Sequence, residues 1–126
     1  MKSRLAKPFF AYLFLFFVWI PSLAFADKAS VSIEAPNKAA IGSEIIIQLT
    51  ITHNANSYFH YVEWVLVKMN EKEINRWDYS SLKKPEGATF AKEIKITIQE
   101  NIDIKAEANC NIHGSKGSIT WKISLE

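Results

Sequence analysis

The feature that most limits the fold of this chain is the strict alternation of apolar and polar residues in two long segments. Over residues 45–51 every second residue is Ile or Leu. Over residues 102–110 the same period places five apolar side chains on one face, and the last of them is Cys110. Successive side chains of a strand point to opposite faces, so this period predicts strands with one buried face. We therefore expect a core enclosed between sheets.

Five further segments have the composition and punctuation of short strands. They cover residues 29–36, 61–69, 71–80, 89–98 and 118–126. The third of these begins in a turn at residues 70–72 and continues as a short strand. In the fourth of these, the expected inward residues are Phe90, Ile94, Ile96 and Ile98, with an interruption near Ala91. In the last, they are Ile119, Trp121, Ile123 and Leu125. About seven strands and no helical period predict an all-β fold, an antiparallel immunoglobulin-like sandwich that forms one domain over residues 27–126.

The first 26 residues have the pattern of a secretory signal peptide. A basic start over residues 2–7 precedes an apolar run over residues 9–20. Ala24 and Ala26 then give the Ala-x-Ala arrangement that signal peptidase cleaves. The run is shorter than the roughly 20 apolar residues of a membrane span. We expect cleavage after Ala26 and a periplasmic or secreted protein; an uncleaved N-terminal anchor is the alternative.

The charge of the remaining chain argues against a nucleic-acid partner. The first 26 residues hold three of the fifteen Lys and Arg residues and no Asp or Glu, which leaves twelve basic and thirteen acidic residues. Nucleic-acid binding needs a clustered positive face. The single cysteine, Cys110, cannot form an internal disulfide. It is expected to be buried, paired between chains or coordinated to a metal.

Three histidines and this cysteine are the side chains best suited to bind a transition metal. His53 and His60 enclose the segment NANSYF, and Cys110 and His113 enclose Asn-Ile. Imidazole and thiolate bind iron, copper and zinc at neutral pH. All four residues lie in or beside expected loops, where strand ends can turn their donors toward one point. A Cys-x-x-His pair also arises by chance, so a buried cysteine near a surface histidine is the alternative interpretation.

Three segments together resemble the superoxide reductases, the family of the neelaredoxins and of the iron-binding domain of desulfoferrodoxins. They are IEAP at residues 33–36, HYVEW at 60–64 and CNIHG at 110–114, in the order and approximate spacing of that family. The resemblance covers nearly all of residues 27–126. HYVEW and CNIHG are fairly specific together, whereas either alone is not.

The resemblance implies an immunoglobulin-like sandwich with one mononuclear non-haem iron (Fe2+/Fe3+). In the family, four histidine nitrogens surround the iron in a plane and a cysteine thiolate binds axially. Superoxide reacts at the open sixth position, takes one electron and leaves as hydrogen peroxide. An anionic sulfur opposite that position donates electron density to the metal, as an axial thiolate does in haem enzymes. Carried over by position, the implied metal ligands are His53, His60, Cys110 and His113. The loop between the two central histidines has six residues where the family has five.

The N-terminal segment departs from the family pattern. The family opens with Glu-Lys-His-Val-Pro, whereas this chain has Asp27, Lys28 and Ala29 at the first three of these positions. The resemblance assigns Lys28 the catalytic role of attracting the anionic substrate. Ala29 replaces a histidine ligand, and residues 27–126 contain no fourth histidine. Three nitrogens and one sulfur therefore leave one equatorial position without a ligand.

Several ways to complete the site stay open. Water, Asp27 or the α-amine created by cleavage after Ala26 could fill the position. Zinc or copper could replace iron, since both accept four nitrogen and sulfur ligands. A blue-copper site usually adds a methionine soon after its last histidine, and none follows His113. The site could also be a relic that binds metal weakly.

These observations favour an exported, iron-dependent superoxide reductase that receives electrons from an unidentified donor protein. The alternative is a non-enzymatic metal-binding or redox-partner module that has lost the fourth histidine. A sandwich used only for protein contacts, with Cys110 buried and inert, is a third hypothesis. A homo-oligomer is possible.

Overall fold

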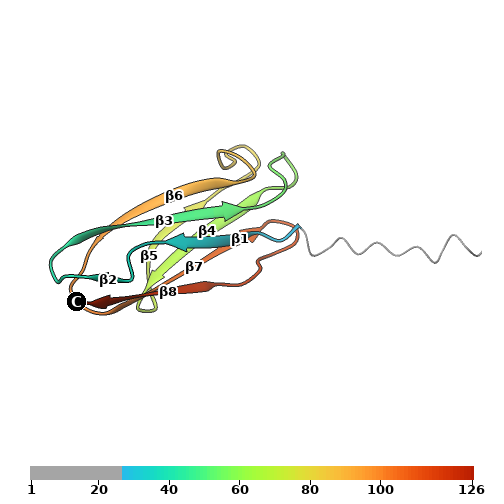
Figure 1. Cartoon of the computed structure of the whole chain (residues 1–126). Coiled ribbons are helices and arrows are strands. Elements are labelled where there is room, and N and C mark those ends of the chain that lie inside the picture. The colour runs from blue at the N-terminus through green and yellow to red at the C-terminus, as the bar shows by residue number, and fades with distance from the viewer. Residues whose placement is uncertain (1–26) are drawn as a thin grey trace, which may run out of the picture.

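The computed structural model describes residues 27–126, and the expected signal peptide lies outside the described residues. Eight strands form the described part of the chain (Figure 1). They are β1 (Ser30–Glu34), β2 (Lys38–Ala39), β3 (Glu44–Thr52), β4 (Val62–Met69), β5 (Lys72–Asp78), β6 (Phe90–Thr97), β7 (Ile102–Cys110) and β8 (Ile119–Leu125). Within residues 27–126 there is no helix of the length and apolar character that crossing a membrane requires.

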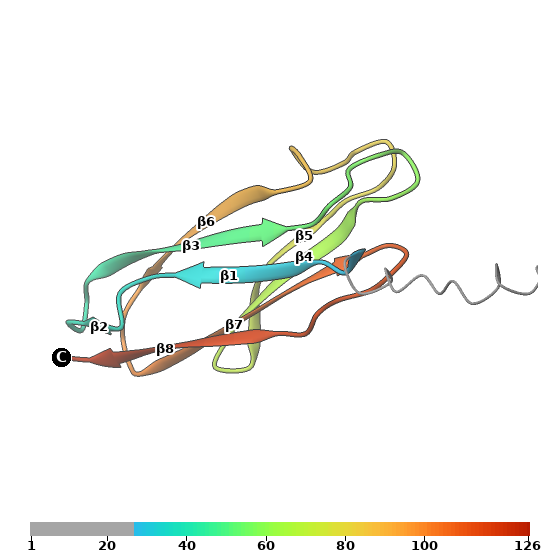
Figure 2. The same cartoon turned by 45° about the vertical axis from the view of Figure 1, so that its right-hand side comes forward.

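The strands form two sheets that face each other (Figure 2). One sheet has the order β1-β3-β6, and the other has the order β2-β8-β7-β4-β5. Every pairing within the sheets is antiparallel except that of β2 with β8. The expected all-β sandwich is confirmed, with eight strands in place of about seven. The additional strand, β2, has only two residues, too few to leave a period in the sequence.

The two alternating segments become the central strands of the two sheets. All four expected inward side chains of β3 are buried, and so are the five of β7, which end at Cys110. Both strands have partners on each side, so their inward faces are covered along their whole length. Burial of apolar side chains at this spacing is the main stabilising term of such a sandwich.

Two strands differ from the expected pattern. In β8 only Ile123 is buried, while Ile119 and Leu125 are exposed and Trp121 is half-buried. The expected interruption in β6 lies at Lys92, which occupies an inward position between Phe90 and Ile94. Its ammonium group lies 5.8 to 6.0 Å from the ring centroids of Trp77, Tyr79 and Phe90 and forms an ion pair with Glu86 at 3.3 Å. Cation–π attraction and this ion pair stabilise a charged side chain at an inward position of the strand.

Several strand ends meet at one end of the sandwich. There β1 begins, β3 ends, β4 begins and β7 ends (Figure 1). The pairing of β4 with β7 shifts between Val62 and Trp64, directly beside Cys110. Such a bulge re-aims the side chains around it. This end of the molecule carries the residues that the sequence nominated as ligands.

Candidate metal centre

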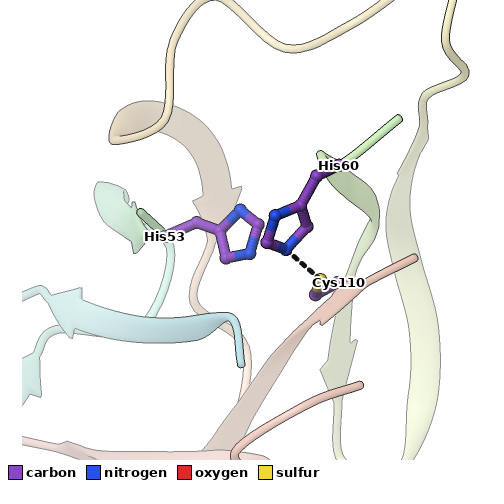
Figure 3. A group of neighbouring side chains, drawn as sticks. All are labelled: His53, His60 and Cys110. Carbon is purple, nitrogen blue, oxygen red and sulfur yellow. Dashed lines mark hydrogen bonds between the residues drawn. The ribbon is translucent and has the colours of Figure 1, made fainter. Parts of the chain in front are cut away.

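His53, His60 and Cys110 converge at this end from three separate strands. His53 follows β3, His60 lies two residues before β4, and Cys110 is the last residue of β7. One donor atom from each lies within 4.8 Å of the other two (Figure 3). Residues 50 positions apart in the chain are thereby brought into direct contact.

Cys110 forms the buried floor of the cluster. Only 1% of the residue is exposed, and its Sγ accepts the backbone N–H groups of Ile112 (3.4 Å) and His113 (3.3 Å). The turn that aims these donors is closed by Gly114, which exchanges two backbone hydrogen bonds with Cys110 at 2.9 and 3.0 Å. Gly114 has a φ of 86°, a conformation that glycine adopts without strain. Donors aimed at sulfur suit an anionic thiolate.

His60 and His113 lie against this sulfur. His60 Nε2 is 3.2 Å from Cys110 Sγ and 3.3 Å from His113 Nδ1. His113 Nδ1 is itself 3.8 Å from the sulfur. Burial lowers the pKa of His60, and the neighbouring His53 and His113 lower it further. A lowered pKa keeps the imidazole neutral, which is the form that binds metals.

His53 is held by backbone carbonyls on both sides of its ring. Its Nδ1 lies 2.9 Å from the oxygen of Ala55, and its Nε2 lies 2.8 Å from the oxygen of Asp27. A neutral imidazole has one N–H, so it can donate to only one of these oxygens. Donation from Nδ1 to Ala55 leaves a lone pair on Nε2, the arrangement usual for a metal-binding histidine.

Asp27 closes the N-terminal side of the cluster. Its Oδ2 lies 3.7 Å from His113 Nε2, and its Oδ1 accepts a hydrogen bond of 2.6 Å from Asn54. That hydrogen bond and the nearby histidines lower the pKa of the Asp27 carboxyl. Two residues later, Ala29 is fully buried and paired to the loop that follows Cys110. Position 29 therefore supplies no imidazole to the cluster.

A family model identifies the family of this chain, and solved structures show which proteins share its fold. The family model of the desulfoferrodoxins matches residues 24–121. The chain belongs to the desulfoferrodoxin family. No curated protein sequence matches it.

The fold of this desulfoferrodoxin family member resembles that of solved superoxide reductases. One structure of the superoxide reductase (neelaredoxin) from Ignicoccus hospitalis has a TM-score of 0.68 and 18% identity over 84% of this chain and 87% of that chain. A second structure of that protein has a TM-score of 0.63 and 18% identity, over 84% and 88%. A PKD domain of an M14-like peptidase from a Thermoplasmatales archaeon has a TM-score of 0.58 and 10% identity, over 79% and 97%. At these identities the likeness shows the shared sandwich fold alone.

The donor spacing fits a single transition-metal ion. Nitrogen and sulfur ligands at about 2.0–2.3 Å from one ion stand roughly 3–4 Å from each other. The contacts among His60, His113 and Cys110 run from 3.2 to 3.8 Å. His53 lies within the wider limit of 4.8 Å. The residues present therefore fit a bound metal of the type that the desulfoferrodoxin family implies.

Lys28 lies next to the cluster in sequence and is half-buried. Among residues 27–126 its side chain makes neither a hydrogen bond nor an ion pair. Its role in attracting an anion stays a prediction.

Asn111 has a positioning role that the sequence alone did not suggest. Its Oδ1 accepts the N–H of Tyr61 (3.0 Å), and its Nδ2 donates to the carbonyl of Phe59 (3.1 Å). The side chain thus ties the loop that carries His60 to the turn that carries Cys110. Its place inside CNIHG was the available signal, but the motif does not say which contacts the asparagine makes.

Proposed function

We propose that this protein is an exported superoxide reductase that holds one iron ion through His53, His60, His113 and Cys110. The observation that supports the proposal is the cluster of His53, His60 and Cys110 in a chain of the desulfoferrodoxin family. His113 lies beside His60 and Cys110 but is not part of that cluster. When bound, iron would supply one electron to superoxide, which takes up two protons and leaves as hydrogen peroxide. A donor protein would then restore the electron.

The residues of the chain contribute binding, charge and exclusion of water. The N–H groups of Ile112 and His113 would stabilise Cys110 as a thiolate ligand. Burial of this sulfur keeps water away from the floor of the site. Ala55 would orient His53 through Nδ1 and leave Nε2 for the metal. Lys28 would raise the local concentration of the anionic substrate.

Export is part of the proposal because the first 26 residues have the pattern of a cleaved signal. A chain that begins at Asp27 is therefore the appropriate test protein. Periplasmic fractionation, followed by N-terminal sequencing of the recovered protein, tests the compartment and the cleavage site together. Recovery of the uncleaved chain in the membrane fraction would contradict both.

Metal analysis combined with visible absorption tests the site directly. The chain that begins at Asp27, loaded with ferrous iron without oxygen and then oxidised, should hold about one iron per chain. It should show a thiolate-to-ferric charge-transfer band. Cys110→Ser should lose the band, and His113→Ala should lower the iron content. Ser118→Ala, an exposed change in the same inter-strand connection, should leave both unchanged.

Superoxide turnover separates the enzyme from a metal-binding module. Iron-loaded protein should consume superoxide faster than an equal amount of free iron, and this excess should vanish in Cys110→Ser. Bound metal without excess turnover would favour the module, since the chain has Ala29 where the family has a histidine. Absence of bound metal in wild type, with ligand variants behaving alike, would refute the site altogether.

A further inference from the structure

Asp27 touches two of the candidate ligands from one position. Its backbone oxygen lies 2.8 Å from His53 Nε2, and its carboxylate lies 3.7 Å from His113 Nε2. The hydrogen bond from Asn54 holds the other carboxylate oxygen. This residue therefore spans the side of the cluster where no fourth histidine is available.

The backbone that follows fixes Asp27 in this place. The N–H of Ala29 donates to the carbonyl of Gly114 (3.2 Å), and the N–H of Lys116 donates to the carbonyl of Ala29 (2.9 Å). The segment is thus tied to the same turn that orients Cys110. The backbone nitrogen of a residue lies within about 3.6 Å of its own carbonyl oxygen. The nitrogen of residue 27 is therefore within reach of the cluster.

The contact at His53 Nε2 depends on the tautomer of the ring. A neutral imidazole donates its single N–H either to the oxygen of Asp27 (2.8 Å) or to the oxygen of Ala55 (2.9 Å). When Nδ1 donates to Ala55, the lone pair of Nε2 is directed to the side of the cluster where the backbone of residue 27 lies. The backbone of residue 27 thus lies where a metal bound to His53 would meet it.

We propose that cleavage after Ala26 creates a further metal ligand, the α-amine of Asp27. This inference rests on the proposed metal site and on the proposed export. A peptide nitrogen has no lone pair to offer a metal, whereas a free amine has one. The amine would bring the donors to four nitrogens and one sulfur, and its own carboxylate could close a chelate ring. The signal peptidase would then complete the metal site as it releases the protein.

Cobalt(II) is a suitable probe because its visible spectrum reports ligand type and coordination number. The test compares the chain that begins at Asp27 with one that carries a single additional glycine before Asp27. We expect the glycine to weaken cobalt binding about 10-fold or more and to change the ligand-field bands. Added imidazole should restore the bands of the extended chain, because it supplies the missing nitrogen.

A second variant separates the amine from the carboxylate. Asp27→Ala in the chain that begins at residue 27 keeps an α-amine, so it should bind cobalt more tightly than the glycine-extended chain. Equal affinity and equal spectra for the extended and unextended chains would overturn the inference, and so would failure of imidazole to restore the bands. If the thiolate-to-cobalt band is present in both chains, the proposed metal site stands without this ligand. If it is absent from both, the proposed site itself fails.

Discussion

Within residues 27–126, the sulfur of Cys110 contacts backbone N–H groups, two imidazoles and the amide of Asn111. The N–H groups of Ile112 and His113 point to it because the chain reverses within four residues and closes at Gly114. The geometry of the ligand thus depends on one backbone conformation. Gly114, which has no metal-binding side chain, therefore helps to set the position of the Cys110 sulfur.

Replacement of Gly114 should therefore weaken metal binding more than a replacement elsewhere that lowers the free energy of unfolding equally. Gly114 and Gly117 both have positive φ, at 86° and 106°, and an added Cβ at either position meets no atom closer than 3.9 Å. Gly114→Ala and Gly117→Ala should each lower the free energy of unfolding by about 1 kcal/mol, measured by chemical denaturation. Only Gly114→Ala should weaken cobalt binding. Equal loss of cobalt affinity in both variants would contradict this account.

At the scale of elements, β3 shows how closely the alternation determines burial. Ile47 is fully buried, while its neighbour Ile46 is 44% exposed. Ile47→Ala should lower the free energy of unfolding by about 2–4 kcal/mol, since it leaves a cavity between the sheets. Ile46→Ala should cost less than about 1 kcal/mol. Thermal or urea unfolding of the two variants measures the difference, and similar losses would mean that the register of β3 is wrong.

The loop before β4 and the turn after β7 are joined by one side chain, that of Asn111. Asn111 ties the segment before β4 to the turn after β7 through both ends of its amide. Asn111→Ala should lower the free energy of unfolding by about 1–2 kcal/mol and weaken metal binding about 10-fold, because His60 is no longer positioned. Asn37→Ala is the control, since that exposed side chain makes no hydrogen bond within residues 27–126. Unchanged cobalt affinity in Asn111→Ala would show that Asn111 does not position His60 for metal binding.

The sequence predicted the strands where a period of two extends over many residues. It did not predict the exposure of β8, because apolar residues there alternate as in a core strand although the facing sheet has only three strands. It predicted an interruption of β6 near Ala91, and the structure places it at the adjacent Lys92. The sequence did not predict that Lys92 would lie beside Trp77 and Tyr79, because those rings come from a distant segment. For the site, the family motifs nominated the four donors. The contacts of Asp27 and Asn111 depend on how loops meet, which no local pattern encodes.

At the scale of the whole molecule, the loops around the candidate site lack charge. Residues 53–62 and 108–115 contain no Asp, Glu, Lys or Arg, although residues 27–126 carry 25 such residues. Lys28 is therefore one of few cations near the cluster. A cation near the cluster attracts an anionic substrate, and the neighbouring carboxylate of Asp27 opposes part of that attraction.

Lys28→Ala should lower the second-order rate constant for superoxide consumption several-fold at low ionic strength. The deficit should shrink in 0.5 M salt, because screening removes steering at a distance. Lys38→Ala is the matched control, since Lys38 is an exposed residue of β2 at the opposite end of the sandwich (Figure 1). Pulse radiolysis measures both rates. Equal rates for Lys28→Ala and wild type would show that this lysine does not steer the substrate.

The position of β8 has a practical consequence for electrochemistry. The strand ends at Leu125, at the end of the sandwich opposite the loops of the candidate site (Figure 1). The nine residues of β7 separate the two ends, a span of about 27 Å at 3.4 Å per residue. If the protein were attached to an electrode through its C-terminus, the length of the β-sheet would separate the candidate metal site from the electrode surface. Current would then require a soluble mediator, whereas adsorption by the loops would bring the metal to the conductor.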